Sequence, residues 1–193
     1  SLDASLLDGV DAVIHLAGAG IGDHRWTDAY KNEIRSSRVH STELLARAIA
    51  ASSDGPKVLL SGSAIGIYGD RGDESLDETS ALGNGFLADV CREWEHATAP
   101  AEQAGVRVAH LRTGIVLTPA GGALKKLLPL FRLGLGGRFG NGKQWQSWIS
   151  IDDEVAAITS LLTSDTAGAV NLTAPNPVTN TEFTRVLGTV LKR

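Results

Sequence analysis

The sequence is poor in sulfur and has no strongly charged segment. Its 193 residues include one cysteine, Cys91, and no methionine, so an intrachain disulfide is excluded. No apolar run is long enough to span a bilayer or to form a signal peptide. The net charge of −4 comes with no basic block, which argues against nucleic acid or an anionic membrane as the main partner. We therefore expect a cytoplasmic protein that binds a small molecule.

Metal-ligand patterns are absent as well. The five histidines show no ligand spacing with carboxylates or with the cysteine, so no metal site is predicted. What the chain does have is a 42% apolar content, enough for one substantial core. Its length is that of a single domain, and we expect residues 1–193 to fold as one layered unit.

Three short apolar runs are each bounded by glycine or small polar residues. They are VDAVIHLAGAG (10–20), KVLLSGSAIGIYG (57–69) and VRVAHLRTGIVL (106–117). A helix-length amphipathic segment follows each run, and this alternation predicts an α/β fold with a doubly wound, mostly parallel sheet. Ligands bind at the carboxyl ends of such strands, so the small residues there are candidate binding residues. The alternative is that they only allow tight turns.

The remaining pattern predicts the other elements. Strands are expected over 10–17, 57–62, 106–112 and 168–173, and helices over 27–51, 85–103, 123–133 and 152–162, with a last helix from about residue 180. Asp152 is the predicted N-cap of the fourth helix, and Asn180 or Thr181 that of the last. The irregular stretches 64–84 and 134–147 are longer than a connection requires, so they are candidates for a substrate lid.

At these residues the chain resembles the extended short-chain dehydrogenase/reductase superfamily. The landmarks are HLAG after a strand, SGSxxGxYG, LRTGIVL and WISIDD. The longer string RTGIVLTPAGGALKKLLPLFRLGLGGRFGNGKQWQSWISIDD is similar to a divergent epimerase-like branch that carries a small extra C-terminal domain. The resemblance covers essentially the whole chain. It implies a Rossmann-like, NAD(P)-binding domain.

The resemblance also shows what is missing. Family members open with a strand and a Gly-x-x-Gly-x-x-Gly turn that holds the dinucleotide pyrophosphate. No such motif precedes Val10, so we expect residues 1–193 to be an incomplete domain without its N-terminal β-α units, whose strand 10–17 has an unpaired edge. Expressed alone, this segment is expected to aggregate or to bind no dinucleotide.

The resemblance places a cofactor, NADP(H) in preference to NAD(H), along the strand ends. Leu16, Ala17 and Gly18 are expected against it, with the alternative that they only pack the sheet. On the following helix, Arg38 is placed at phosphate oxygens and Glu33 at sugar hydroxyls. Val116 is expected at the nicotinamide end, with ordinary burial in a strand as the alternative. The remaining cofactor contacts expected at the strand ends are Ser61, Gly62 and Thr113.

The catalytic pattern of the superfamily is broken. Active members use a Tyr-x-x-x-Lys pair on the helix after the serine strand, together with a serine at the strand end. Ser63 fits the serine position. Phe86 and Val90 stand where the tyrosine and lysine are expected, and neither side chain transfers a proton.

Two functions follow from this departure. In the first, the protein is an NADP(H)-dependent oxidoreductase or epimerase in which Tyr68, His24 or Asp23 takes over proton transfer. In the second, it is a dinucleotide-binding sensor or scaffold with little turnover. The expected substrate of an enzyme is a small molecule such as a nucleotide sugar. Arg132, Arg138 or Lys143 would meet its phosphate, with the alternative that they only belong to a solvated loop.

Other features have structural alternatives. Trp26, Trp145 and Trp148 either line the substrate site or attach long loops to the core. Cys91 and Trp94 are expected in the core. A homodimer through the helix expected at 85–103 is a further option that the surface pattern does not decide.

Overall fold

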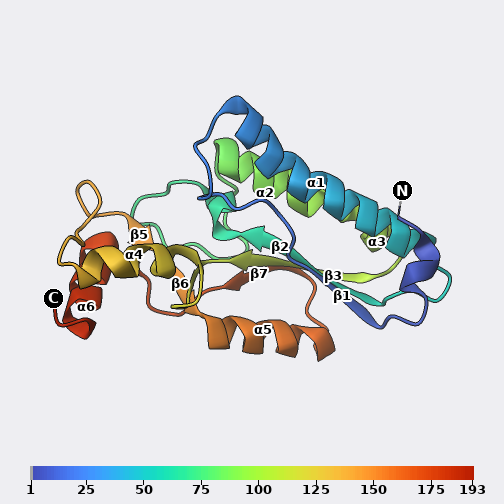
Figure 1. Ribbon diagram of the computed structural model, residues 1–193. Coiled ribbons are helices and arrows are strands. Elements are labelled where there is room, and N and C mark those ends of the chain that lie inside the picture. The colour runs from blue at the N-terminus through green and yellow to red at the C-terminus, as the bar shows by residue number, and fades with distance from the viewer. Residues whose placement is uncertain (1) are drawn as a thin grey trace.

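The computed structural model describes residues 2–193, which form a three-layer α/β sandwich (Figure 1). Its central sheet has four strands, β1 (Ala12–His15), β2 (Val58–Ala64), β3 (Arg107–Thr113) and β7 (Gly168–Leu172), in the order β1-β2-β3-β7. All three strand pairs are parallel. The predicted α/β class and parallel sheet are confirmed.

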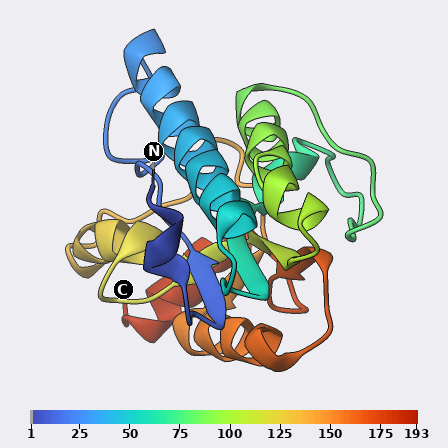
Figure 2. The same cartoon turned by 90° about the vertical axis from the view of Figure 1, so that its right-hand side faces the viewer.

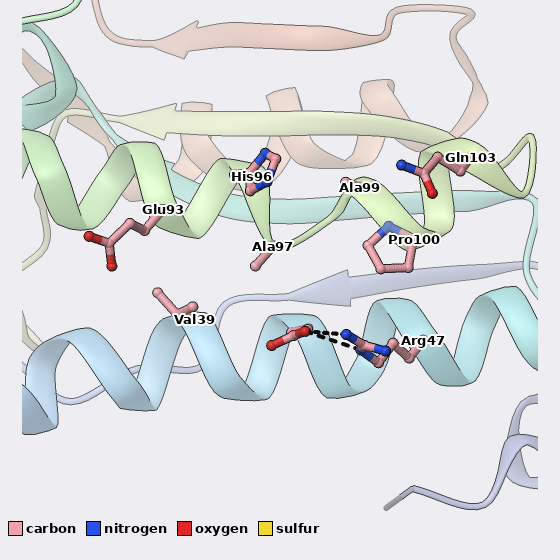
Figure 3. A pocket seen from close by; sticks show the side chains of 9 residues that line it. Val39, Arg47, Glu93, His96, Ala97, Ala99, Pro100 and Gln103 are labelled. Carbon is pink, nitrogen blue, oxygen red and sulfur yellow. Dashed lines mark hydrogen bonds and ion pairs between the residues drawn. The ribbon is translucent and has the colours of Figure 1, made fainter.

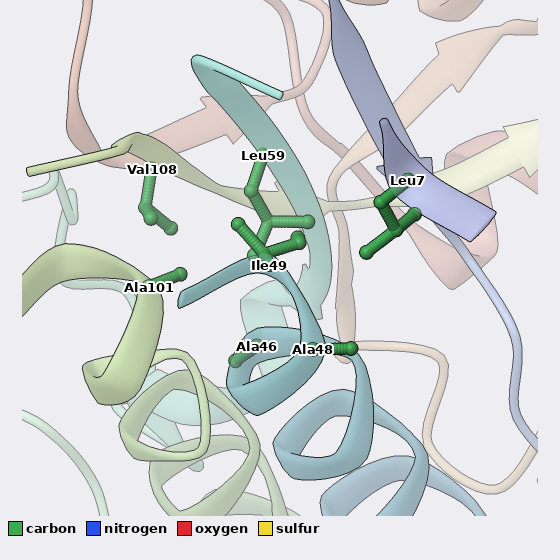
Figure 4. Packing of buried hydrophobic residues seen from close by; sticks show 7 residues of the cluster. All are labelled: Leu7, Ala46, Ala48, Ile49, Leu59, Ala101 and Val108. Atoms are coloured by element: carbon green, nitrogen blue, oxygen red, sulfur yellow. The ribbon is translucent and has the colours of Figure 1, made fainter. Parts of the chain in front are cut away.

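Helices cover both faces of this sheet. One face carries α1 (Asp28–Ala51), α2 (Phe86–His96) and α3 (Ala99–Gln103), and the other carries α5 (Ile151–Thr163) (Figures 1 and 2). Side chains alternate across the strands, so Leu59 packs toward α1 and α3, whereas Leu60 packs toward α5. Figure 4 shows the first of these two cores, where Leu59 and Val108 meet Ile49 and Ala101.

A second group of elements lies beyond the carboxyl ends of the strands, at the left of Figure 1. It comprises β4 (Ile115–Leu117), paired with β6 (Trp148–Ser150), and β5 (Trp145–Gln146), paired with β8 (Val178–Thr179). The helices α4 (Gly122–Arg132) and α6 (Asn180–Val190) complete it. The 3-10 turns η1 (Ala4–Leu7) and η2 (Ile65–Tyr68) precede β1 and follow β2, respectively.

Several predicted boundaries are wrong for local reasons. The first strand covers 12–15 rather than 10–17, because only these residues pair with β2. The helix expected over 85–103 is two helices, since Thr98 donates its hydroxyl proton to the Glu95 carbonyl (2.7 Å) and Pro100 lacks the N–H that a continuous helix needs.

Two predicted N-caps are also wrong. Ser150, not Asp152, caps α5, accepting from the Asp153 N–H at 3.0 Å. Thr179, not Asn180 or Thr181, caps α6. Both caps have extended backbone one residue before the helix, which leaves their hydroxyl oxygen free to accept from the first turn. The acidic residues after Ser150 instead lie in the first turn, where the helix dipole favours them.

The strand β1 lies at one edge of the sheet within residues 2–193, and the adjoining Leu16 is 56% exposed. Pairing of a further strand with this edge stays a prediction. None of the helices in this described part of the chain is both long and apolar enough to cross a membrane.

Gly62 on β2 provides a test of the packing between the sheet and α2. A Cβ at this position would lie 2.7 Å from a ring carbon of Trp94 and 3.3 Å from the His15 carbonyl oxygen. We expect Gly62→Ala to lower the free energy of unfolding by about 1–3 kcal/mol, because the indole has to shift inside a packed layer.

The matched control is Gly137→Ala, because a Cβ there meets nothing within 4 Å and the backbone is not left-handed. Urea unfolding of both variants measures the difference. Equal midpoints for the two would contradict the packing argument.

Candidate functional site

The carboxyl ends of β1 and β2 form a partly open edge. Leu16, Ala17 and Gly18 follow β1 and are exposed, as a surface that receives a ligand requires. On β2 the residues are covered instead: Ser61 is fully buried, and Gly62 is buried beneath Trp94. Of the predicted cofactor contacts on these two strands, those after β1 are accessible and those on β2 are not.

Arg38 and Trp94 stack beside this edge. The Arg38 guanidinium lies 5.1 Å from the centre of the Trp94 ring, and the Trp94 indole N–H donates to the Thr42 hydroxyl at 2.9 Å. A Cβ on Gly18 would lie 3.0 Å from the Arg38 side chain. Gly18 and Gly62 are therefore small because this protein's own side chains fill the space, which favours the packing alternative for both.

A buried ion pair crosses from β3 to α2. Arg112 donates from Nε to Oε1 and from Nη2 to Oε2 of Glu95, both at 2.9 Å, and the side chains are 6% and 13% exposed. Ser63 donates its hydroxyl proton to Glu95 Oε1 at 2.7 Å. Burial opposes ionisation of Glu95, but the hydrogen bonds from Arg112 and Ser63 outweigh it and hold the pKa of this carboxyl below its usual value.

The same guanidinium holds Tyr68. Arg112 Nη1 donates to the Tyr68 hydroxyl at 2.9 Å, and this hydroxyl donates to Asn171 Oδ1 at 2.7 Å. Tyr68 is only 3% exposed and Ser63 only 5%. Tyr68, a candidate for proton transfer, and Ser63, the predicted serine of the site, both donate their hydroxyl proton inside one buried network. This placement favours a structural role for each.

The helix α2 has an apolar face where the acid-base pair is expected. Val90 is 2% exposed and packs against Tyr30 and Ile34 of α1. Phe86 meets the Trp26 ring edge-on at 5.5 Å between centroids, and the Lys31 ammonium lies 5.8 Å from the Phe86 ring centre. Phe86 and Val90 therefore make packing contacts with α1 and with Trp26, and neither side chain is itself titratable.

The loop between β1 and α1 carries the remaining candidates. His24 is exposed, with its ring edge-on to Tyr30 at 4.9 Å. Asp23 forms an ion pair with Lys126 of α4 at 3.1 Å, and Lys126 also donates to the Gly22 carbonyl at 2.8 Å. Of the predicted catalytic side chains, His24 and Asp23 are exposed at this edge, and Asp23 is engaged by Lys126, whereas Tyr68 and Ser63 are buried.

At the end of β3, Thr113 and Val116 are half-buried. Thr113 donates its hydroxyl proton to Glu154 Oε1 at 2.9 Å, and Val116 packs in the core beneath α5. Glu154 is 7% exposed, and its Oε2 has no hydrogen-bond partner within residues 2–193. Burial raises the pKa of this carboxyl, against a smaller opposing effect of the Thr113 hydrogen bond.

The three candidate tryptophans attach loops. Each indole N–H donates to a neighbouring segment, Trp26 to the Ile21 carbonyl (2.7 Å), Trp145 to Asp73 (2.6 Å) and Trp148 to the Asn176 carbonyl (3.1 Å). The Trp145 bond joins the two long loops predicted as lids. These hydrogen bonds support the alternative in which the tryptophans attach loops to the rest of the protein.

The other candidates are distributed as follows. Trp94 and Cys91 are buried as expected, and burial raises the pKa of the cysteine thiol to about 11. Exposed positions are those of Glu33, Arg132, Arg138 and Lys143. The described residues contain no cluster of three or more His, Cys, Asp or Glu suited to a metal ion.

A shallow hollow of about 350 Å³ lies between α1 and the α2–α3 pair (Figure 3). Val39, Glu93 and Pro100 are among its lining residues, and Glu43 and Arg47 pair within it. None of its lining residues lies at the strand ends or in the loop after β1, so it is separate from the edge described above.

Sequence reasoning missed Glu95, Glu154 and the stacking of Arg38 on Trp94. A charged residue inside the apolar run VAHLRTGIVL was a signal that Arg112 needs a buried partner. Nothing in the sequence indicated which acid supplies it, because Glu95 lies seventeen positions before Arg112 on a different element.

The buried ion pair predicts a large loss of stability when one partner is removed. Glu95→Gln should lower the free energy of unfolding by about 3–5 kcal/mol, since it leaves the Arg112 charge buried without compensation. Glu93→Gln is the matched control: Glu93 is a half-exposed neighbour whose pair with Arg35 at 3.4 Å is accessible to solvent, and we expect less than about 1 kcal/mol there. Chemical denaturation measures both, and similar losses would contradict the prediction.

Glu154 predicts a pH dependence. Because its folded pKa is raised, its contribution to stability is fully present below the unfolded pKa near 4.5 and is lost as pH rises through the folded pKa. Glu154→Gln keeps an acceptor for Thr113 but does not ionise, so its stability relative to wild type should grow from pH 4 to pH 8, by about 1.4 kcal/mol for each pKa unit of the shift.

Thermal unfolding across this range measures the effect. Glu182→Gln, an exposed acid in the first turn of α6, is the control and should follow the wild type. If the stability of Glu154→Gln equals that of the wild type at every pH, ionisation of Glu154 does not cause the predicted pH dependence.

Comparison with known proteins identifies the family. The model of the NAD dependent epimerase/dehydratase family matches residues 1–173. An epimerase family protein of Mycobacterium bovis is 47% identical over 192 residues, which are 99% of this chain and 63% of that protein. The chain therefore spans less than two thirds of the length of this relative.

Two solved structures share the fold. The nucleoside-diphosphate sugar epimerase from Corynebacterium glutamicum is 46% identical, with a TM-score of 0.83 over 98% of this chain and 40% of that one. The human epimerase family protein SDR39U1 with NADPH is 34% identical, with a TM-score of 0.92 over 97% of this chain and 64% of that one. The match over most of the chain, together with the parallel sheet and its helices, shows that the protein belongs to the NAD-dependent epimerase/dehydratase family and has its Rossmann-like fold.

Proposed function

We propose that this protein binds NADP(H) along the carboxyl ends of β1, β2 and β3 and acts as an oxidoreductase or epimerase. The observation that carries the proposal is the human structure with NADPH, which matches 97% of this chain at a TM-score of 0.92. When bound, the dinucleotide supplies or accepts a hydride.

The residues of the edge support this cofactor in part. Leu16 is 56% exposed beside Ala17 and Gly18, which provides an apolar surface with little side-chain bulk. Arg38 adds a positive charge next to Gly18, and the half-buried Val116 follows the end of β3. The buried Ser61 and Gly62 would act through the backbone or through packing, because neither has an accessible side chain.

For proton transfer we propose His24. Its ring is exposed in the loop after β1, whereas Ser63 and Tyr68 both donate their protons within the Arg112 network. His24 reaches solvent and is carried by a loop fastened to α4 through Asp23 and Lys126. Histidine is the side chain that most often serves as a general acid or base in enzymes.

A second function has its own support. Phe86 and Val90 are packed hydrophobic residues, and no acid-base pair takes their place on α2. This arrangement suits a module that binds the dinucleotide and senses its presence with little turnover. Binding is common to both functions, so turnover decides between them.

For the substrate we propose a nucleotide sugar or a small carbonyl compound, on the basis of the similar nucleoside-diphosphate sugar epimerase of Corynebacterium glutamicum. Arg132, Arg138 and Lys143 are exposed and accessible to a substrate phosphate. A cytoplasmic location and a homodimer through α2 and α3 stay predictions.

Titration calorimetry on the natural full-length protein tests the cofactor. We expect NADPH to bind more tightly than NADH. Heat from neither cofactor would contradict the proposal, and equal affinities would contradict only the preference for NADP(H).

A turnover assay with NADPH and a panel of nucleotide sugars and small carbonyls tests the chemistry. His24→Ala should lower kcat by about 10²- to 10⁴-fold, the usual contribution of a general acid or base. His40→Ala, an exposed histidine on α1, is the control. Binding without turnover in the wild type favours the sensor, and unchanged kcat in His24→Ala contradicts the role of His24.

A further inference from the structure

Four consecutive carbonyl groups of the loop between β1 and α1 (the β1–α1 loop, residues 16–27) accept hydrogen bonds from side chains. Each carbonyl has a different donor: Ala19 accepts from Arg38 Nη1 (2.9 Å), Gly20 from the Tyr30 hydroxyl, Ile21 from Trp26 Nε1 (2.7 Å) and Gly22 from Lys126 Nζ (2.8 Å). These bonds fix the position of the loop, and the loop carries His24, the residue proposed for proton transfer.

The first three donors come from α1 or from the loop itself. Tyr30 and Arg38 lie on α1, where Tyr30 is 7% exposed and Arg38 is half-buried. Trp26 lies in the loop and packs edge-on against Phe86 of α2. A buried donor that loses its acceptor finds no water to replace it, so the bonds from Tyr30 and Arg38 persist while α1 is packed.

The fourth donor comes from a different group of elements. Lys126 lies on α4, beyond the strand ends, and its ammonium also forms an ion pair with Asp23 at 3.1 Å. The two side chains are 60% and 58% exposed. An ion pair this accessible to water contributes little to stability and is screened by salt. Among the four contacts of the loop, the one with α4 is therefore the one that opens most readily.

The turn at Gly20 sets the position of Asp23. The Asp23 N–H donates to the Gly20 carbonyl at 3.3 Å, and the Asp23 carboxylate occupies the space that a Cβ on Gly20 would need. The backbone at Gly20 is not left-handed, so alanine can adopt its conformation. A methyl group at this position would displace the carboxylate from Lys126 and leave the lysine itself unchanged.

We propose that Lys126 is a positioning residue for His24, and that its bonds to Gly22 and Asp23 form a latch between the β1–α1 loop and α4. With the latch closed, the loop is held from both sides, and His24 keeps its place relative to α4. With the latch open, only the bonds from α1 and Trp26 hold the loop. The role of His24 in this inference rests on the proposed function, whereas the latch itself does not.

The alternative is an ordinary surface ion pair that has no effect on the loop. The bonds on the α1 side would then hold the loop by themselves, and removal of Lys126 would not change how often the loop opens. Trypsin distinguishes the two, because the loop contains a cleavage site at Arg25 and a protease acts on the opened form of a loop.

The experiment measures tryptic cleavage of the Arg25–Trp26 bond in the natural full-length protein. The variants are Lys126→Met, Lys126→Arg and the control Lys125→Met, which removes the exposed neighbouring lysine of α4. Rates are divided by those of an unstructured peptide with the loop sequence, which corrects for effects of salt on trypsin. We expect Lys126→Met to be cleaved about two- to fivefold faster than the wild type, the range that loss of an exposed ion pair allows. Lys126→Arg and Lys125→Met should match the wild type.

Two further measurements use the same assay. Raising the salt concentration from about 20 mM to about 500 mM should speed cleavage of the wild type and leave that of Lys126→Met unchanged. Gly20→Ala should speed cleavage as Lys126→Met does, although it retains the lysine. Equal cleavage rates in Lys126→Met, Gly20→Ala and Lys125→Met would overturn the latch.

The positioning role is tested by turnover. Lys126→Met should lower kcat and leave the affinity for NADPH and the thermal unfolding temperature unchanged, and Lys126→Arg should restore kcat. Faster cleavage with an unchanged kcat would overturn the positioning of His24. No turnover by the wild type would overturn the proposed enzyme and the positioning role with it, and proteolysis would still decide whether the latch exists.

Discussion

The Arg112 guanidinium lies in the layer between the sheet and α2, where its side chain is only 6% exposed. Most of the polar contacts at the strand ends follow from this one charge. It donates hydrogen bonds to both carboxylate oxygens of Glu95, which fixes α2 relative to β3. It also donates to the Tyr68 hydroxyl, which fixes η2. Hydrogen bonding to Glu95 raises the pKa of Arg112, so the pair stays charged. Removing either partner leaves a buried charge, and for this reason the network behaves as a unit.

The network also determines which side chains at the strand ends can donate a proton to a ligand. Ser63 and Tyr68 have the residue types of a reductase site, but their protons belong to Glu95 and Asn171. A hydroxyl has one proton, so a hydroxyl that donates inside the core has no proton to donate to a ligand. The accessible groups at this edge include His24 and Asp23 in the loop and the half-buried Arg38 beside Gly18. The proposed function therefore assigns its accessible groups to the loop after β1 and to the helix α1 rather than to β2 and α2.

A glycine near a strand end can make room either for a ligand or for a side chain of the protein, and the sequence does not distinguish the two. At Gly18 and Gly62 the missing Cβ makes room for Arg38 and Trp94. Whether a ligand or a side chain uses such space depends on which residues the helices bring to the same place. The same limitation applies to the tryptophans. Their indole N–H groups donate to loop carbonyls and to Asp73, and the sequence does not indicate these partners.

The sequence by itself determined the α/β class, the parallel strands, the core positions of Cys91 and Trp94, and the family, because these depend on periodicity and on local motifs that neighbouring residues carry. It did not determine that the helix is divided at Thr98, before Pro100, or that Ser150 and Thr179 cap the last two helices. Only the tertiary structure decided that Glu95 meets Arg112, that Glu154 is buried against Thr113, and that Arg38 takes its place over Trp94. Those contacts join residues on different elements, and their energies depend on burial and distance, which exist only after the layers have packed.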